Sequence, residues 1–445
     1  MAPGVHASWR WGNQGRIHGS ARLAACGLKE ARWRHGRLSG LDVEKWGDWV
    51  LGKASAKGKQ SPERIAIVSA HARSLTNFRG PLIRALRDSG VEVHAFAPEV
   101  MRNEEVRKEL ESWGVRVHDV PLRRTGLSPL EDARALFSLY RKLRMIAPDA
   151  VLSYNIKPVI YGTLAGAMAG VPERYGLITG LGYAFSENPR GKRLIVQKAA
   201  LALYRMAGAR ISTMFFQNPD DRDEFLDRKI IDGPGRACVV NGSGVDLAHF
   251  QPKPHQTGAI RFLMLARLLG EKGVREFASA ASRIRESFPN AEFRLAGDLD
   301  ANPNAVSRSE LDEWVANGTL KYLGRVSDVR PELEMATVFV LPSYYREGTP
   351  RTVLEAMATG RPVITTNAPG CRETVAHGEN GFLVPTRDVN ALVAAMEQFI
   401  LDRDLARRMG ERSLQIAIEK YDVHKVNRVM LRRMGVGLVE GQGGF

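Results

Sequence analysis

The chain has 445 residues, and its 44% hydrophobic and 25% charged residues are ordinary for a globular enzyme of two domains. The absence of any run of about 18 apolar residues argues against a transmembrane helix, and the wide separation of Cys26, Cys238 and Cys371 argues against a structural zinc site. The net charge of +15 sits mainly in the first part of the chain, since residues 1–60 hold eleven Lys or Arg against four Asp or Glu, whereas residues 251–445 hold 26 against 24.

Residues 1–60 differ from the rest of the chain. They are rich in Arg, Gly, Trp and Ala, show no sustained periodicity, lack the apolar core of a secretory signal and run into a linker-like stretch at 53–62. We expect this basic extension to be disordered and to take no part in catalysis. Its charge suits an anionic partner, such as phospholipid headgroups, a diphosphate or, less favourably, nucleic acid. An atypical N-terminus without a partner is the alternative.

A regular alternation of strands and helices begins at Arg64. Apolar runs predict strands at 64–69, 91–96, 115–118 and 150–153, and longer patterns predict helices at 80–90, 129–146 and 158–169. This order of elements is typical of a parallel, doubly wound sheet. We therefore predict a Rossmann-like domain over residues 63–250.

The pattern restarts after a candidate linker at 251–255. Strands are predicted at 261–265, 292–296, 338–341 and 362–365, and helices at 274–288, 352–359 and 390–400. Residues 258–405 should form a second Rossmann-like domain, and the helices of residues 406–435 are expected to pack back on the first. Two such α/β domains facing across a cleft would hold a ligand at the carboxyl ends of their strands.

The strongest motif is the pair Glu347 and Glu355, which follows the predicted strand ending at Leu341. Gly348 and Pro350 predict a tight loop, with a helix beginning near Thr352. A helix N-terminus offers unpaired N–H groups to a phosphate. The two carboxylates, one on the loop and one about a turn into the helix, can accept hydrogen bonds from the hydroxyls of one polar ligand.

A second motif is the pair Arg267 and Lys272, on the loop after the predicted strand 261–265. Two cations at this place can neutralise a diphosphate. Taken alone, a solvated basic loop is the commoner outcome, but the glutamates in the same half of the chain favour the functional interpretation. Residues 321–326 could present backbone groups to a base or form an ordinary turn, and the sequence leaves both open.

The first half carries weaker signals. Asn77, Arg79 and Gly80 precede a predicted helix, where Gly80 permits close backbone approach and Arg79 could meet an anion. Asn155 and Lys157 follow the predicted strand 150–153. The stretch 183–210 sets six Lys or Arg and several apolar residues against a single acid. It is either an interfacial helix that docks on anionic lipid or a core-packed helix with a solvated basic face.

Taken together, the motifs resemble those of the retaining glycosyltransferases of family 4, which have the GT-B fold. Glu347 and Glu355 match the family's E-x7-E pattern, and the Arg267…Lys272 pair and the segment 241–246 (NGSGVD) match in order and spacing. The resemblance covers about residues 63–430. In the first half, residues 155–162, 178–182 and 216–221 look most like bacterial transferases that extend a sugar on undecaprenyl diphosphate.

The resemblance implies a role for each matching position. Glu355 would bind the ribose hydroxyls, Glu347 would hold the donor sugar, and Arg267 and Lys272 would grip the diphosphate. The donor site would be completed by Gly348, Thr349, Arg351 and Thr352, with Arg325 and Val326 beside the uracil. The acceptor would enter near Asn77, Arg79, Gly80, Asn155 and Lys157. No metal and no cofactor other than the UDP-sugar substrate is expected.

One departure concerns the loop 153–157, which lacks the histidine that many family members have there. The expected reaction moves a hexose or N-acetylhexosamine, with retained configuration, from a UDP-sugar to a polyprenyl-diphosphate-linked glycan. The protein is expected in the cytoplasm, bound peripherally to the inner leaflet of the membrane. Nucleic acid is not expected as a partner. The alternatives are a transferase with a soluble acceptor, a nucleotide-sugar epimerase of the same fold, and a non-catalytic binder.

Overall fold

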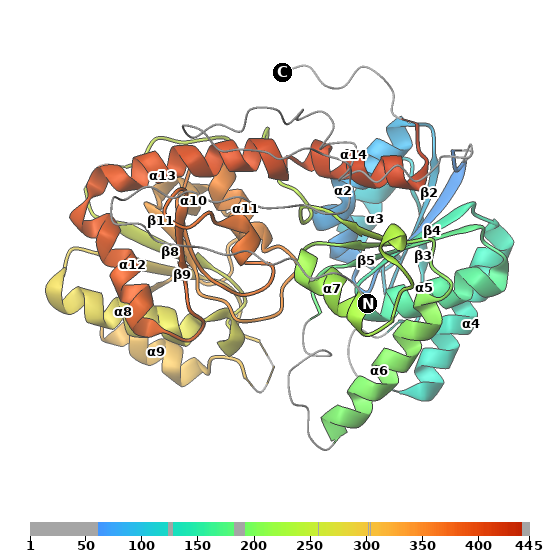
Figure 1. Ribbon diagram of the computed structural model, residues 1–445, viewed down its shortest axis with the longest axis horizontal. Coiled ribbons are helices and arrows are strands. Elements are labelled where there is room, and N and C mark those ends of the chain that lie inside the picture. The colour runs from blue at the N-terminus through green and yellow to red at the C-terminus, as the bar shows by residue number, and fades with distance from the viewer. Residues whose placement is uncertain are drawn as a thin grey trace, which may run out of the picture. The chain divides into compact units, whose positions relative to one another are not determined.

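The computed structural model describes residues 61–122, 128–181, 192–256, 258–300, 302 and 304–437. The extension predicted to be disordered, residues 1–60, lies outside this part, as do residues 183–191 of the basic stretch. The described residues form the predicted α/β architecture, with two parallel sheets that carry helices (Figure 1).

The first sheet has seven strands in the order β3-β2-β1-β4-β5-β6-β7, all paired in parallel. Its strands are β1 Arg64–Val68, β2 Glu92–Ala97, β3 Arg116–Asp119, β4 Ala150–Tyr154, β5 Glu173–Ile178, β6 Thr213–Phe216 and β7 Ala237–Val239. Its helices are α2 Ala72–Asp88, α3 Glu104–Ser112, α4 Pro129–Ile146, α5 Ile156–Ala169, α6 Lys192–Gly208, α7 Pro219–Asp227 and the 3₁₀ turn η2 Pro234–Arg236.

The second sheet has six parallel strands in the order β10-β9-β8-β11-β12-β13. Its strands are β8 Arg261–Leu265, β9 Glu292–Ala296, β10 Lys321–Tyr322, β11 Val338–Leu341, β12 Val363–Thr366 and β13 Gly381–Val384. Its helices are α8 Val274–Ser287, α9 Arg308–Ala316, α10 Arg330–Met335, α11 Arg351–Ala358 and α12 Val389–Leu401, with the 3₁₀ turns η3 Gly270–Lys272 and η4 Arg372–Thr374. The chain closes with α13 Arg403–Ile416, the π-helical turn η5 Ala417–Tyr421 and α14 Val423–Met434.

Both sheets have the strand order of a Rossmann fold. In this fold the first strands are added on one side of the first strand of the sheet and the later strands on its other side, while all strands stay parallel. The change of side lies between β1 and β4 in the first sheet and between β8 and β11 in the second. Ligands of such sheets bind outside the carboxyl ends of the strands at this point. The loops that follow β8 and β11 carry Lys272 and Glu347, so the topology brings these predicted residues to the same edge.

The predicted start of the first helix is wrong. We expected it at Gly80, but α2 begins at Ala72 and Pro81 lies inside it. An interior proline cannot donate to the carbonyl four residues earlier, which here belongs to Asn77. That carbonyl instead accepts a hydrogen bond from Nη1 of Arg351. A partner from the second half of the chain thus satisfies the group that Pro81 leaves unpaired.

The two closing helices belong to different cores. Ala406 and Met409 of α13 are buried with the core of the second sheet, whereas Val426 and Met430 of α14 are buried with β1, β2 and α2 of the first. The chain therefore returns to its first half through α14, which Figure 1 draws beside α2.

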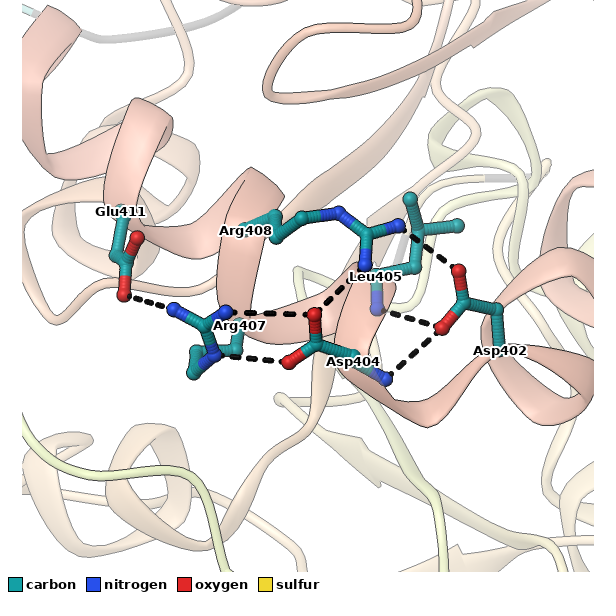
Figure 2. Close-up of polar contacts among 6 residues, drawn as sticks. All are labelled: Asp402, Asp404, Leu405, Arg407, Arg408 and Glu411. Carbon is teal, nitrogen blue, oxygen red and sulfur yellow. Dashed lines mark hydrogen bonds and ion pairs between the residues drawn. The ribbon is translucent and has the colours of Figure 1, made fainter.

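The turn into α13 is held by charged side chains, as Figure 2 shows. The Asp402 carboxylate caps the helix by accepting from the backbone N–H groups of Asp404 and Leu405. Arg407 and Arg408 pair with Asp404 at 2.8 and 2.7 Å. These pairs are exposed, so each contributes little beyond fixing the start of the helix.

The helix α6 shows features of both interpretations of the basic stretch. Tyr204 and Ala207 are buried in the first half's core, as a core-packed helix requires. Ile195 and Met206, however, are 70% and 50% exposed on the same helix. The helix therefore has one packed side and exposed apolar side chains.

Candidate functional site

The carboxylate of Glu347 lies in a nearly buried ion pair. Its Oε1 is 2.7 Å from Nζ of Lys272 and accepts a hydrogen bond of 2.8 Å from Oγ of Ser343. The side chains of Lys272 and Glu347 are only 13% and 11% exposed. The two residues that the sequence placed on separate strand-to-helix loops are thus in direct contact.

Backbone contacts hold these two loops together. The N–H groups of Tyr344 and Tyr345 donate to the carbonyl of Glu271, at 2.9 and 3.0 Å. Gly273 has a φ of 79°, and a Cβ there would lie 2.2 Å from the Pro342 carbonyl oxygen. Only glycine combines that left-handed conformation with so close an approach. Gly273 therefore lets the turn η3, which ends at Lys272, lie against the loop that carries Glu347.

Glu355 occupies the fifth position of α11 and is 7% exposed. Burial raises the pKa of its carboxyl group, and the nearby Arg351 guanidinium, 2.8 Å away, opposes that rise. Arg351 is the same residue that donates to Asn77 in α2. The helix α11 begins at Arg351, and Pro350, the N-cap residue before it, provides no side-chain cap, so the first N–H groups of the helix lack a side-chain acceptor at the cap.

The other predicted donor-site residues lie around the loop that follows β9. Arg267 is 3.0 Å from Asp300, and Arg325 is exposed and 3.8 Å from Asp298. Val326 is half-buried against the second half's core. In the described part of the chain, the ion pairs of Arg267 and Arg325 are with these aspartates, and not with Glu347 or Glu355.

The predicted acceptor residues of α2 lie within that helix, and not in a loop before it as we expected. Arg79 is 2% exposed, with its guanidinium 5.3 Å above the Tyr154 ring and its Nη2 donating to Ser243 at 3.2 Å. Burial lowers the pKa of Arg79 to about 10. Gly80 packs against Trp113, since a Cβ there would meet that indole at 3.1 Å.

The other two predicted acceptor residues lie at the start of α5. Asn155 precedes the helix, with a φ of 71°, and donates to Thr179 at 3.1 Å. Lys157 forms an ion pair of 2.7 Å with Asp132, and both side chains are nearly buried. The charge of Lys157 is therefore already neutralised by Asp132, which lies in α4.

A hollow of about 670 Å³ lies in the first half, and the sequence did not predict it. It is bounded by the residues that follow β1 and β2 and by the N-terminal ends of α2 and α3. The residues lining it include His71, Glu99, Arg102 and Glu105. Its position at the carboxyl ends of the strands is where α/β sheets bind ligands.

Sequence reasoning also missed the contacts of residues 217–221. Gln217, Asn218 and Asp221 come from the first half, yet they touch the loop of residues 346–349. The one signal was the match of 216–221 to bacterial relatives, and it carried no role. Asn218 followed by Pro219 is also a typical helix start, and it does cap α7.

Asp221 is fully buried at the start of α7. Burial raises the pKa of its carboxyl group to about 7, although Arg346, 3.7 Å away, and the Asn218 amide both favour the charged form. Asp220 and Glu373 raise it further. The folded chain therefore holds a proton on Asp221 at a pH where the unfolded chain has released it.

This proton makes stability depend on pH. An acid with a raised pKa contributes stability that is lost as the pH rises from about 4 to above 7. Asp221→Asn cannot titrate, so the variant should gain stability over the wild type as the pH rises, by up to about 4 kcal/mol. Urea unfolding of both proteins at pH 5, 6, 7 and 8 measures the difference, and a constant difference would contradict the raised pKa.

Among the described residues, no group of three His, Cys, Asp or Glu side chains is arranged to hold a metal ion. None of their helices has the length and apolar character needed to cross a membrane. Cys238 and Cys371 are free thiols.

Comparisons with known proteins cover most of the described chain. Residues 77–242 match the family model described as Glycosyl transferase 4-like domain, and residues 246–415 match Glycosyl transferases group 1. The chain is 29% identical over 372 residues to the N,N'-diacetylbacillosaminyl-diphospho-undecaprenol alpha-1,3-N-acetylgalactosaminyltransferase of Campylobacter jejuni, covering 81% of this chain and 95% of that protein. It is also 29% identical over 304 residues to the UDP-Gal:alpha-D-GlcNAc-diphosphoundecaprenol alpha-1,3-galactosyltransferase of Escherichia coli, covering 65% and 76%.

Solved structures share the fold at lower identity. Sucrose-phosphate synthase from Thermosynechococcus elongatus superposes with a TM-score of 0.68 at 18% identity, covering 83% of this chain and 98% of that one. The Anabaena protein HepE in complex with UDP gives a TM-score of 0.66 at 19% identity, with the same coverage.

Proposed function

Since the chain belongs to the glycosyltransferases with the GT-B fold, we propose that it transfers a hexose or N-acetylhexosamine from a UDP-sugar to a glycan on polyprenyl diphosphate. The observation that carries the proposal is the contact of Glu347 with Lys272 beside the uncapped start of α11. Both curated relatives act, by their names, on sugars linked to undecaprenyl diphosphate. We place the reaction in the cytoplasm, where such an acceptor would be extended.

In the proposed donor site, each group binds a different part of the UDP-sugar. Glu355 accepts hydrogen bonds from the ribose hydroxyls, and Glu347 accepts them from the donor sugar, since carboxylates bind hydroxyl pairs strongly. Lys272 and Arg267 bind the diphosphate together with the first N–H groups of α11, at Arg351 and Thr352. Gly348 and Thr349 line the same loop, and Arg325 and Val326 lie beside the uracil.

The proposed reaction retains the configuration at the sugar. The bond between C1 and the leaving phosphate oxygen breaks, and an acceptor hydroxyl oxygen bonds to C1 from the same face. The hydroxyl proton passes to the leaving diphosphate, so no protein base is needed. Lys272 stabilises the charge that develops on the diphosphate, and Glu347 orients the sugar without bonding to C1.

The proposed acceptor side is the first half of the chain. The predicted cations Arg79 and Lys157 are already bonded to Ser243 and Asp132, and Asn77 and Gly80 lie inside α2. The hollow beside His71 and Arg102 offers open space at the carboxyl ends of β1 and β2. We therefore propose that the acceptor's sugar enters there.

The direct test incubates the protein with labelled UDP-sugars, with and without an undecaprenyl-diphosphate-linked sugar. Label moving into the lipid fraction only when acceptor is present supports the proposal. Formation of an isomeric UDP-sugar without acceptor would identify an epimerase. Binding without turnover of any donor would identify a binder, and transfer to a free oligosaccharide alone would identify a soluble acceptor.

Peripheral attachment to anionic membrane is part of the same proposal, and α4 offers a suitable surface. Leu130, Phe137 and Met145 are 76%, 57% and 80% exposed, and Arg134 and Arg141 are exposed between them. Spacings of three and four residues place these side chains on one helical face. Apolar side chains mixed with cations are typical of helices that lie at an anionic lipid surface.

The membrane contact can be measured by vesicle sedimentation. Phe137→Ser should lower partitioning onto vesicles rich in phosphatidylglycerol by about tenfold or more, because burial of one aromatic side chain contributes about 1.5–3 kcal/mol. Leu401→Ser is the matched control, since Leu401 is 72% exposed but lies at the end of α12. Equal partitioning of the wild type, Phe137→Ser and Leu401→Ser would argue against α4 as the membrane-binding surface.

A further inference from the structure

We infer that Asn218 is a positioning residue of the donor site, which fixes the backbone at Glu347 from the first half of the chain. The inference rests on the proposed role of Glu347 as the carboxylate that holds the donor sugar. Asn218 itself contacts neither carboxylate of the E-x7-E pair in the described structure; it acts through the main chain.

The Asn218 side chain is fully buried and uses both ends of its amide. Its Oδ1 accepts from the Asp221 N–H at 2.8 Å, which caps α7. Its Nδ2 donates to the carbonyls of Glu347 and Gly348, at 3.1 and 3.2 Å, and lies 3.1 Å from Asp221 Oδ2. One residue therefore links the start of α7 to two successive carbonyls of the loop.

Neighbouring contacts extend the same link to both sides. Thr349 donates from its N–H to Gln217 Oε1 at 3.3 Å and from its hydroxyl to the Gln217 carbonyl at 3.0 Å. Arg346 lies 3.7 Å from Asp221 and 3.6 Å from Glu224. Every residue from Arg346 to Thr349 thus contacts the segment 217–224.

Glycine makes this approach possible. A Cβ on Gly348 would lie 2.9 Å from the Thr179 carbonyl carbon, and one on Gly180, whose φ is 103°, would lie 2.5 Å from the Gly348 nitrogen. Both distances are too short for any side chain. The main chain at residues 179–180 therefore lies against the loop at Gly348, whose carbonyl accepts from the Asn218 amide.

Glu347 is consequently held at two points by different parts of the chain. Lys272 and Ser343 of the second half hold its carboxylate, and Asn218 of the first half holds its carbonyl. Groups that orient a substrate lose most of their effect when displaced by about 1 Å. Loss of the Asn218 amide should thus impair the handling of the sugar more than that of the nucleotide.

The test is the variant Asn218→Asp. An aspartate still caps α7, but it turns a donor into an acceptor that faces two carbonyl oxygens. We expect sugar transfer to fall by about 30- to 100-fold and affinity for the UDP-sugar to weaken relative to affinity for UDP. Asn218→Ser keeps a capping hydroxyl but lacks the amide. In this variant too, affinity for the UDP-sugar should weaken relative to affinity for UDP, but by a smaller factor.

Asn380→Asp is the matched control. Asn380 is also fully buried, accepts from the Ala376 N–H at 2.8 Å and donates to the Thr374 carbonyl at 3.1 Å, so its partners lie outside the loop 346–349. It should lose stability as Asn218→Asp does, while keeping the ratio of UDP-sugar to UDP affinity of the wild type.

The outcomes separate this inference from the proposed function. A wild-type protein that transfers no sugar counts against the function, whereas the affinity ratio is measured without an acceptor and tests Asn218 alone. Wild-type ratios in both Asn218 variants would overturn the inference. An equal loss of UDP and UDP-sugar affinity would also overturn it, because that pattern indicates a general folding defect.

Discussion

Replacing Glu347 with Gln is expected to lower the rate of sugar transfer by about 10²- to 10³-fold while UDP affinity stays within about threefold of the wild type. Glutamine has the same shape, so Ser343 can still donate to its Oε1 atom. It lacks the charge that accepts strongly from sugar hydroxyls and pairs with Lys272 at 2.7 Å. Steady-state transfer and UDP titration of the same preparation measure both quantities.

The control for this variant is Glu332→Gln. Glu332 pairs with Arg294 at 2.6 Å, with side-chain exposures of 15% and 8% that resemble those of the Glu347 pair. Removing its charge weakens a nearly buried ion pair in the same half, on α10 and not on the loop that carries Glu347. Transfer per folded molecule should survive in this control. Full activity of Glu347→Gln would refute the role given to Glu347.

Replacing Lys272 with Met is expected to cause a comparable loss of transfer, about 10²- to 10³-fold, with a different pattern in binding. The Lys272 ammonium is proposed to contact the diphosphate, which UDP and UDP-sugar share. UDP affinity should therefore fall together with transfer, by about tenfold or more. Isothermal titration with UDP distinguishes this variant from Glu347→Gln.

The charge-conserving variant Lys272→Arg serves as its control. It should recover part of the UDP affinity, because a guanidinium also binds phosphate, but less of the transfer, because its planar fork cannot keep the geometry of the ammonium. Unchanged UDP affinity in Lys272→Met would place the diphosphate elsewhere.

Most of the fold could be predicted because strands buried on both faces of a parallel sheet appear in the sequence as short apolar runs. The runs at 261–265, 292–296 and 338–341 coincide with β8, β9 and β11, and the helix at 129–146 coincides with α4. The start of α2 could not be predicted in the same way. Pro81 is tolerated inside that helix where the Asn77 carbonyl finds Arg351, a residue 274 positions away that no local pattern can indicate.

In the candidate site, too, the features set by local sequence could be predicted, and the contacts between distant segments could not. The positions of Glu347 and Glu355 follow from the strand, loop and helix around them, which are local. The pairing of Lys272 with Glu347 and the contacts of Asn218 with their loop depend on how distant segments meet. Arg267 was expected to lie ready for a diphosphate, but its partner Asp300 comes from the loop after a different strand.

These pairings give the proposed donor site its own counter-ions. Four ion pairs join the charges expected to meet the substrate, namely Lys272 with Glu347, Arg351 with Glu355, Arg267 with Asp300 and Arg325 with Asp298. A nucleotide that enters such a site finds each of these charged side chains already paired with a side chain of opposite charge. To bind, it must replace that side chain as the partner. At the two less exposed pairs, Lys272 with Glu347 and Arg351 with Glu355, much of the attraction is offset by the loss of the ion pair that the ligand replaces. Discrimination among ligands then depends on whether a molecule can replace several pairs at once, as a diphosphate joined to a ribose and a sugar can, and inorganic phosphate cannot.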